Sequence, residues 1–146
     1  MSISARDRLS AWAPVVVWAA VIFYMSTDEM SAEHTRPWLE GIVRFFLPSV
    51  SDAFFDVLHM AVRKLAHVSE YFVLALFVDR GLRRGSTLSP ARAPLTAFVL
   101  SALYSLSDEG HQVFVATRTA SLLDCGLDSI GAGLAALRMR GRSYLG

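Results

Sequence analysis

The chain has 146 residues, of which 53% are hydrophobic and 18% charged, and its formal net charge is +1. A mean hydropathy of +0.41 is high for a protein that folds in water, and the small net charge gives nucleic acid no reason to bind. A single cysteine excludes an internal disulfide framework. The composition indicates one all-α domain over residues 1–146 that contacts membrane lipid.

The first predicted element covers residues 9–26, which carry no charge and no polar stripe. These 18 positions span about 27 Å as a helix, close to the thickness of the hydrocarbon core. Arg6 and Arg8 precede the apolar run, as in a signal peptide, but no small-x-small cleavage site follows it directly. We therefore predict an uncleaved first transmembrane helix.

A loop of about thirty residues follows the first span, and its charge is acidic overall. Within it, residues 38–47 are amphipathic and aromatic but too short to cross a bilayer. We expect this stretch to lie in the headgroup plane and to cap one face of the protein. The acidic residues of the loop are Asp28, Glu29, Glu33, Glu40, Asp52 and Asp56.

Three further spans are predicted at about 57–78, 93–115 and 120–137. Ser89 and Pro90 have the residue types of a helix cap and a first helical position, and they would start the third span. Residues 116–119 make a tight connection, which forces the third and fourth helices to be antiparallel neighbours. The predicted fold is an integral membrane four-helix bundle.

The basic residues of the loops predict the orientation of these spans. Three of them lie on the side of the long loop: Arg36, Arg44 and Arg118. Nine fall on the other side: Arg6, Arg8, Arg80, Arg83, Arg84, Arg92, Arg138, Arg140 and Arg142. Because basic loops stay in the cytoplasm, both termini are predicted to be cytoplasmic and the acidic loop extracytoplasmic.

Each of the last three spans carries polar residues at helical spacing along one face. The second span has Lys64, His67 and Tyr71, with Arg63 and Glu70 beside them. The third has a seam of Ser101, Ser105, Asp108 and Gln112, flanked by Glu109 and His111. The fourth has Ser121, Asp124, Asp128 and Gly131, and Gly131 and Gly133 would let helices approach closely.

In the predicted topology, all three seams are most charged in their outer halves, so we expect one outward-facing pocket. Ionisable residues in a membrane helix are costly, which makes them functional candidates. Ion pairs that only join helices, such as Lys64 with Asp108 or Arg118 with Asp124, are the structural alternative. His67, Glu70, Asp108, Glu109 and His111 include metal-ligand types, but their spacing matches no strong motif, so no metal or cofactor is assigned.

These residues resemble the motifs of the VanZ-like family. The resemblance rests on Ser26 at the end of the first span, Lys64-x-x-His67-x-x-x-Tyr71 in the second, and Asp108-Glu109-x-His111-Gln112-x-Phe114 in the third. It continues through Arg118-x-x-Ser121-x-x-Asp124-x-x-x-Asp128-x-x-Gly131 and covers nearly the whole chain. The chain departs from the family where Ala116-Thr117 replace Pro-Gly and where Asp128 replaces asparagine.

The resemblance implies a bacterial cytoplasmic membrane protein with a role at the cell envelope, since the founding member is associated with resistance to the glycopeptide teicoplanin. The leading hypothesis is a protein that binds an anionic envelope component, through Arg118, Lys64 and His67. Acid–base or metal-assisted chemistry, with Glu109 or Asp124 as base, and proton-coupled transport are the alternatives, so enzymatic activity stays open. The candidate cluster is Lys64, His67, Glu70, Tyr71, Asp108, Glu109, Gln112, Arg118, Asp124 and Asp128.

Overall fold

The computed structural model describes residues 3–114 and 121–143, and these ranges contain helices and no strand. The all-α class predicted from the sequence is therefore confirmed for the described part of the chain. Four helices coincide with the four predicted spans, and a fifth helix and a 3₁₀ turn lie between the first two. The elements are α1 (Ala5–Met25), η1 (Asp28–Met30), α2 (Ala32–Phe46), α3 (Asp52–Gly85), α4 (Ala93–Gln112) and α5 (Leu122–Ser143).

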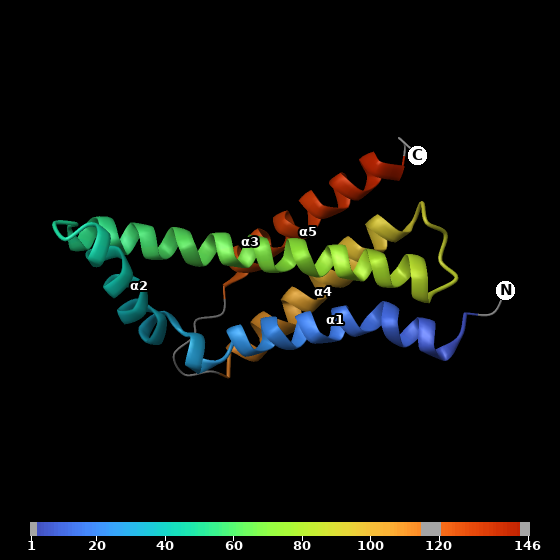
Figure 1. Ribbon diagram of the computed structural model, residues 1–146, viewed down its shortest axis with the longest axis horizontal. Coiled ribbons are helices and arrows are strands. Elements are labelled where there is room, and N and C mark those ends of the chain that lie inside the picture. The colour runs from blue at the N-terminus through green and yellow to red at the C-terminus, as the bar shows by residue number, and fades with distance from the viewer. Residues whose placement is uncertain (1–2, 115–120, 144–146) are drawn as a thin grey trace.

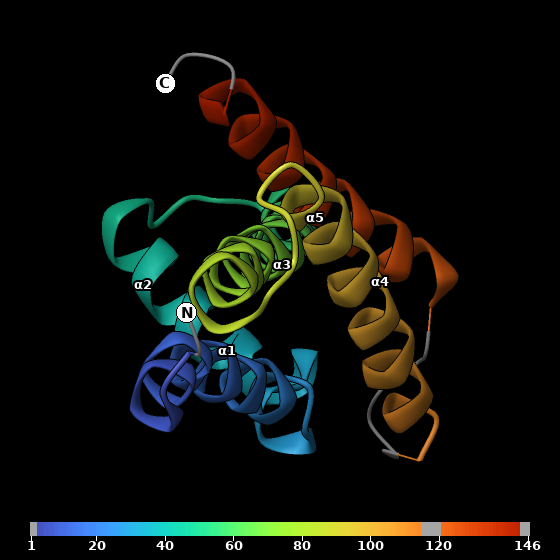
Figure 2. The ribbon, with the colours of Figure 1, turned by 90° about the vertical axis from the view of Figure 1, so that its right-hand side faces the viewer.

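Helix α3 occupies the centre of the molecule, with α1 on one side and α4 and α5 on the other (Figures 1 and 2). The start of α1 and the end of α5 lie at the same end, and α2 lies at the opposite end (Figure 1). Buried Leu74, Ala75 and Val78 of α3 pack with small residues such as Ala97 of α4 and Ala132 of α5. These small side chains let the outer helices approach α3 closely.

Helix α3 is longer than predicted, because its 34 residues extend beyond residues 57–78 in both directions. At a rise of about 1.5 Å per residue it is about 51 Å long. Ser51 caps its first turn by accepting a hydrogen bond from the Phe54 backbone N–H (3.3 Å). The extra turns at this end carry Asp52 and Asp56 beside α2.

Two local predictions need correction. Residues 38–47, predicted as part of a loop, belong mostly to a regular helix, α2. The third helix begins at Ala93 with Pro94 in its first turn, whereas the carbonyl of Ser89 accepts a hydrogen bond from Arg92 N (2.9 Å) in the turn before it. Residues 116–119, the predicted tight connection, lie outside the described residues.

The close helix approach predicted at Gly131 is confirmed. A Cβ atom at this position would overlap the backbone carbonyl of Val68, so only glycine lets α5 meet α3 here. Gly133 does not have this role, because a Cβ there would lie 3.8 Å from the Phe98 ring, an ordinary van der Waals distance.

Among the described helices, α1 alone is long and apolar enough to cross a membrane by length and composition. Only 11% of its most apolar stretch is buried against the rest of the protein. Val16 and Val17 are accordingly exposed. The other long helices carry ionisable residues, which include Lys64, Asp108 and Asp124.

Candidate functional site

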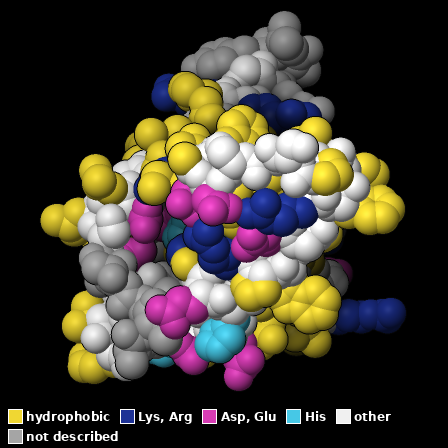
Figure 3. Space-filling view, turned by 90° about the vertical axis from the view of Figure 1, so that its left-hand side faces the viewer, with side chains coloured by type: hydrophobic (Ala, Val, Ile, Leu, Met, Phe, Trp, Pro, Cys, Tyr) yellow, Lys and Arg dark blue, Asp and Glu magenta, His cyan; other side chains and the backbone are white. Residues whose placement is uncertain are grey.

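Two neighbouring cavities with three lining residues in common lie at the end of the molecule that holds α2 and the start of α3, near the ends of α1 and α4 and the start of α5. Figure 3 looks onto this end, where Lys, Arg, Asp and Glu side chains gather at the centre and hydrophobic side chains surround them. The outer cleft, of about 500 Å³, is lined by Ala32, Arg36, Asp56, His59, Met60, Arg63, Lys64, His67, Gln112 and Asp124. The inner pocket, of about 60 Å³, is lined by Ile22, Met25, Ser26, Met30, Arg63, Ala66, His67, Glu70, Asp108 and Gln112.

Arg63, His67 and Gln112 line both cavities and form the boundary between them. Arg63 and His67 come from the same face of α3, one helical turn apart, and Gln112 ends α4. Among the described residues, Arg63 has no carboxylate within ion-pair distance. Its guanidinium charge is thus available at the junction of the two cavities.

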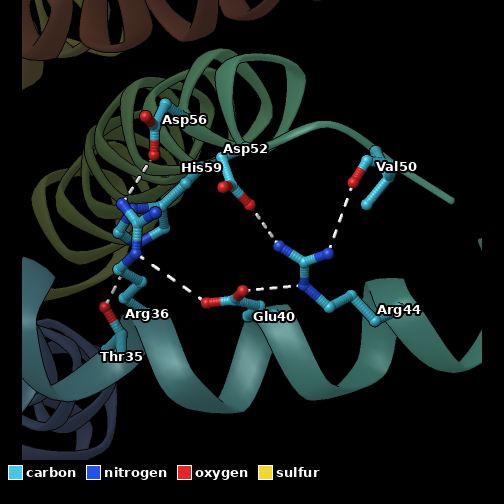
Figure 4. A network of polar contacts seen from close by, with 8 residues as sticks. All are labelled: Thr35, Arg36, Glu40, Arg44, Val50, Asp52, Asp56 and His59. Atoms are coloured by element: carbon cyan, nitrogen blue, oxygen red, sulfur yellow. Dashed lines mark hydrogen bonds and ion pairs between the residues drawn. The ribbon is translucent and has the colours of Figure 1, made fainter. Parts of the chain in front are cut away.

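No residue of α2 is buried. Ion pairs and a cation–π contact therefore join this helix to α3. Arg36 Nη1 lies 2.6 Å from Asp56 Oδ1, and its guanidinium stacks 5.1 Å from the centre of the Phe55 ring. Arg44 pairs with Asp52 and donates to Glu40 Oε1 (2.7 Å), as Figure 4 shows. These two hydrogen bonds raise the pKa of the Arg44 guanidinium, which stays charged.

The outer cleft contains an ion pair that joins α3 to α5. Lys64 Nζ lies 3.2 Å from Asp124 Oδ1, and the two side chains are 45% and 22% exposed. Lys64 therefore pairs with Asp124 and not with Asp108, the partner considered from the sequence. Both groups stay in contact with the open part of the cleft.

His67 is held from behind by a buried carboxylate of α5. Its Nδ1 lies 3.1 Å from Oδ1 of Asp128, a side chain that is 1% exposed. The other oxygen of Asp128 accepts a hydrogen bond from Ser105 Oγ of α4 (2.6 Å). Three helices thus hold the His67 side chain, which also lines both cavities.

Buried polar atoms line the inner pocket. Gln112 Nε2 donates to Asp108 Oδ2 (3.1 Å), and the Ser26 side chain lies on the other side of the same carboxyl group, within reach of it. Asp108 is 5% exposed and Ser26 4%. Glu70 also lines this pocket.

The structure brings six of the ten candidate residues to the cavities and sets three apart, and the tenth lies outside the described residues. Tyr71 is fully buried in the core below them. Glu109 is buried and accepts a hydrogen bond from the Ser121 backbone N–H (2.6 Å), which joins the end of α4 to the start of α5. Asp128 lies behind His67, and Arg118 lies outside the described residues. The residues at the cavities are Lys64, His67, Glu70, Asp108, Gln112 and Asp124.

Sequence reasoning gave no site role to Arg36, Asp56 and His59, although all three line the outer cleft. A signal for two of them was present, because Asp56, His59, Arg63 and His67 follow one another at spacings of 3, 4 and 4. The polar face of α3 therefore continues outward beyond Lys64. Arg36 joins it only because α2 folds back onto α3.

Among the described residues, no group of three or more His, Cys, Asp or Glu side chains is placed to hold a metal ion.

The described residues are all-α, and polar residues of α3, α4 and α5 that belong to the motifs between residues 26 and 131 line the two cavities. A family model described as VanZ/LLP1 matches residues 11–140. The chain belongs to the VanZ/LLP1 family, and the resemblance found in its sequence is confirmed. No curated protein and no solved structure gives a significant match.

Proposed function

We propose that the protein crosses the bacterial cytoplasmic membrane four times and binds an anionic component of the cell envelope in the outer cleft. Helices α1, α4 and α5 have 21, 20 and 22 residues, each close to the roughly 20 that a membrane span requires. Large apolar side chains on their outer faces support this reading, because water would not favour them: examples are Leu103 (56% exposed) and Leu137 (66%).

The charge of the cleft supports an anionic ligand. Among the described residues, Arg36, Arg63 and Lys64 line it together with two carboxylates, Asp56 and Asp124. Each carboxylate already pairs with a cation, Asp56 with Arg36 and Asp124 with Lys64. Arg63 is the third cation, and its lack of a carboxylate partner among the described residues is the observation that carries the proposal.

A guanidinium group in the wall of a cleft is suited to bind phosphate or carboxylate. Its planar donor fork can bind two oxygens of either group at once. His59 and His67 add further donors or acceptors within the same cleft. The ligand that fits is an envelope lipid or peptide that presents a phosphate or a carboxylate.

Membership in the VanZ/LLP1 family supports a location in the membrane and does not name a ligand. By this reading both termini are cytoplasmic and α2 lies at the outer surface, so the cleft faces the cell envelope. Glycopeptide resistance of the teicoplanin type is a phenotype that such a binder could produce, because it would alter access to an envelope component.

The test measures binding to the full chain in lipid nanodiscs by calorimetry. The probes are inorganic phosphate, dioctanoyl phosphatidic acid and N-acetylalanine, which stand for a free phosphate, a lipid phosphate and a peptide carboxylate. We expect at least one probe to bind, and Arg63→Gln to weaken it about tenfold, a loss of about 1.4 kcal/mol.

Arg44→Gln is the matched control, because Arg44 pairs with Glu40 and Asp52 and does not line the cleft. It should leave the dissociation constant unchanged. Equal weakening by both variants, or no binding of any probe, would overturn the proposal.

A further inference from the structure

The His67 ring is fixed in one orientation, although an ion pair that only joined two helices would not need a fixed ring. Asp128 receives two hydrogen bonds, from His67 Nδ1 and from Ser105 Oγ, so the carboxylate cannot rotate away from the ring. A carboxylate on Nδ1 keeps a proton on that nitrogen and leaves Nε2 of the neutral ring as an acceptor. His67 lines both cavities, so an acceptor on this ring lies close to groups bound there.

The inner pocket is suited to hold water next to His67. Its volume of about 60 Å³ exceeds the roughly 10–15 Å³ that one water molecule needs. Asp108 and Ser26 are buried, line this pocket and lie within reach of one another. A pocket of this size with polar side chains in its wall can hold water that hydrogen-bonds to them.

The outer cleft would hold the other reactant. Arg63 lies at the boundary of the two cavities, and Lys64 and Arg36 line the cleft beyond it. An anion bound to Arg63 therefore meets the inner pocket on one side and the open cleft on the other. The second side gives room for the group to which the anion is attached.

From these contacts we propose that the protein hydrolyses a phosphate ester or phosphoanhydride bound in the outer cleft, with His67 as general base. The proposal rests on the anion binding proposed above. His67 Nε2 takes a proton from the water in the inner pocket, and the water oxygen forms a bond to phosphorus. The bond from phosphorus to the leaving oxygen breaks, that oxygen takes a proton from solvent in the open cleft, and His67 returns its proton to solvent.

The surrounding residues have separate roles in this step. Arg63 and Lys64 stabilise the negative charge that develops on the phosphoryl oxygens. Asp108 and Ser26 orient the water, and Asp128 is a positioning residue that acts only through His67. The substrate class is a phosphorylated molecule whose remaining part lies in the open cleft or in the lipid beside it.

The experiment incubates the full chain in nanodiscs with three probes in water enriched in oxygen-18. Farnesyl pyrophosphate and dioctanoyl phosphatidic acid represent lipid substrates, and inorganic pyrophosphate represents a soluble one. We expect phosphate release from at least one probe, with the oxygen-18 in the released phosphate because water attacks phosphorus. Release from the lipid probes alone identifies a lipid substrate, and release from pyrophosphate alone identifies a soluble one.

Two variants test the residues. His67→Asn keeps an amide donor toward Asp128 and removes the base, and it should lower kcat at least 100-fold. Asp128→Asn should lower kcat at least tenfold at unchanged KM, because it disturbs the ring and not the binding cations. His34→Gln is the control, since His34 bonds to Ser31 and to the Asp28 carbonyl away from both cavities.

The outcomes separate this inference from the proposed function. If His67→Asn still binds inorganic phosphate but no longer releases phosphate from the probes, the proposed binding and the proposed hydrolysis both stand. If the wild-type protein binds the probes and releases no phosphate from any of them, hydrolysis is overturned and binding stands. Release that survives His67→Asn, or oxygen-18 in the alcohol product, also overturns the role of His67.

Discussion

Lys64 Nζ and Asp124 Oδ1 lie 3.2 Å apart, although their residues are 60 positions apart in the chain. The pair joins α3 to the first turn of α5 at the wall of the outer cleft. It also holds the Lys64 ammonium in place and offsets its charge. The two residues should therefore have opposite effects on an anion bound in the cleft.

The first prediction concerns this pair. Lys64→Gln removes a cation from the cleft and should weaken phosphate binding about fivefold, while Asp124→Asn should strengthen it by a similar factor. Both factors correspond to about 1 kcal/mol, as expected for a partly exposed ion pair. Calorimetric titration with inorganic phosphate measures them. Weaker binding in Asp124→Asn, with the protein still folded, would mean that the carboxylate itself contacts the ligand.

The second prediction concerns the approach of α5 to α3. Gly131→Ala should lower the free energy of unfolding by about 1–3 kcal/mol, because its methyl group would overlap the Val68 carbonyl and push the helices apart. Unfolding in mixed detergent micelles, followed by circular dichroism, measures the loss. Gly126→Ala is the control in the same helix, since a Cβ there meets nothing within 4 Å. It should be neutral or stabilising, because alanine favours helix.

The third prediction concerns the outer face of α2. Trp38 is 80% exposed, and Phe45 and Phe46 beside it are also exposed, which suits contact with lipid headgroups and upper acyl chains. Lipids brominated near the headgroup should quench the fluorescence of Trp38 strongly. The measurement uses a protein in which Trp12 and Trp18 are replaced by phenylalanine. Quenching that appears only with bromine near the bilayer centre, or not at all, would contradict this position.

The fourth prediction concerns topology. A reporter fused after Gly146 should be active only in its cytoplasmic form, and one inserted between residues 47 and 51 only in its extracytoplasmic form. The first site follows the basic end of α5, and the second follows α2 at the opposite end of the molecule (Figure 1). The reverse pattern would turn the cleft toward the cytoplasm and remove the envelope from its reach.

The helices and their polar faces could be predicted from the sequence because both depend on local chemistry. Apolar length predicts a span, and polar residues at spacings of three and four share a face whatever lies opposite. His67, Asp108 and Asp128 were assigned to polar seams in this way. The family motifs supported the same residues, since they occur at the same spacings.

Membership in a seam does not decide the depth of a residue or its partner. Tyr71 shares a face with Lys64, but it lies about 10 Å further along α3, within the core. Glu109 follows Asp108, and the turn of about 100° between them directs it to Ser121 N and not to the cavities. The amphipathic pattern of residues 38–47 was visible in the sequence, but the helix that contains most of them begins earlier, at Ala32, and its contact with α3 depends on the fold.

The sequence by itself therefore determined an all-α chain, its four long helices and the residues on each polar face, since a helix sets these within a few turns. Only the tertiary structure decided that Asp128 supports His67, that Asp124 pairs with Lys64 and that Arg36 reaches the same cleft as Arg63. These relationships join positions far apart in the chain. Their distances depend on how closely and at what depth the helices pack, which no local pattern records.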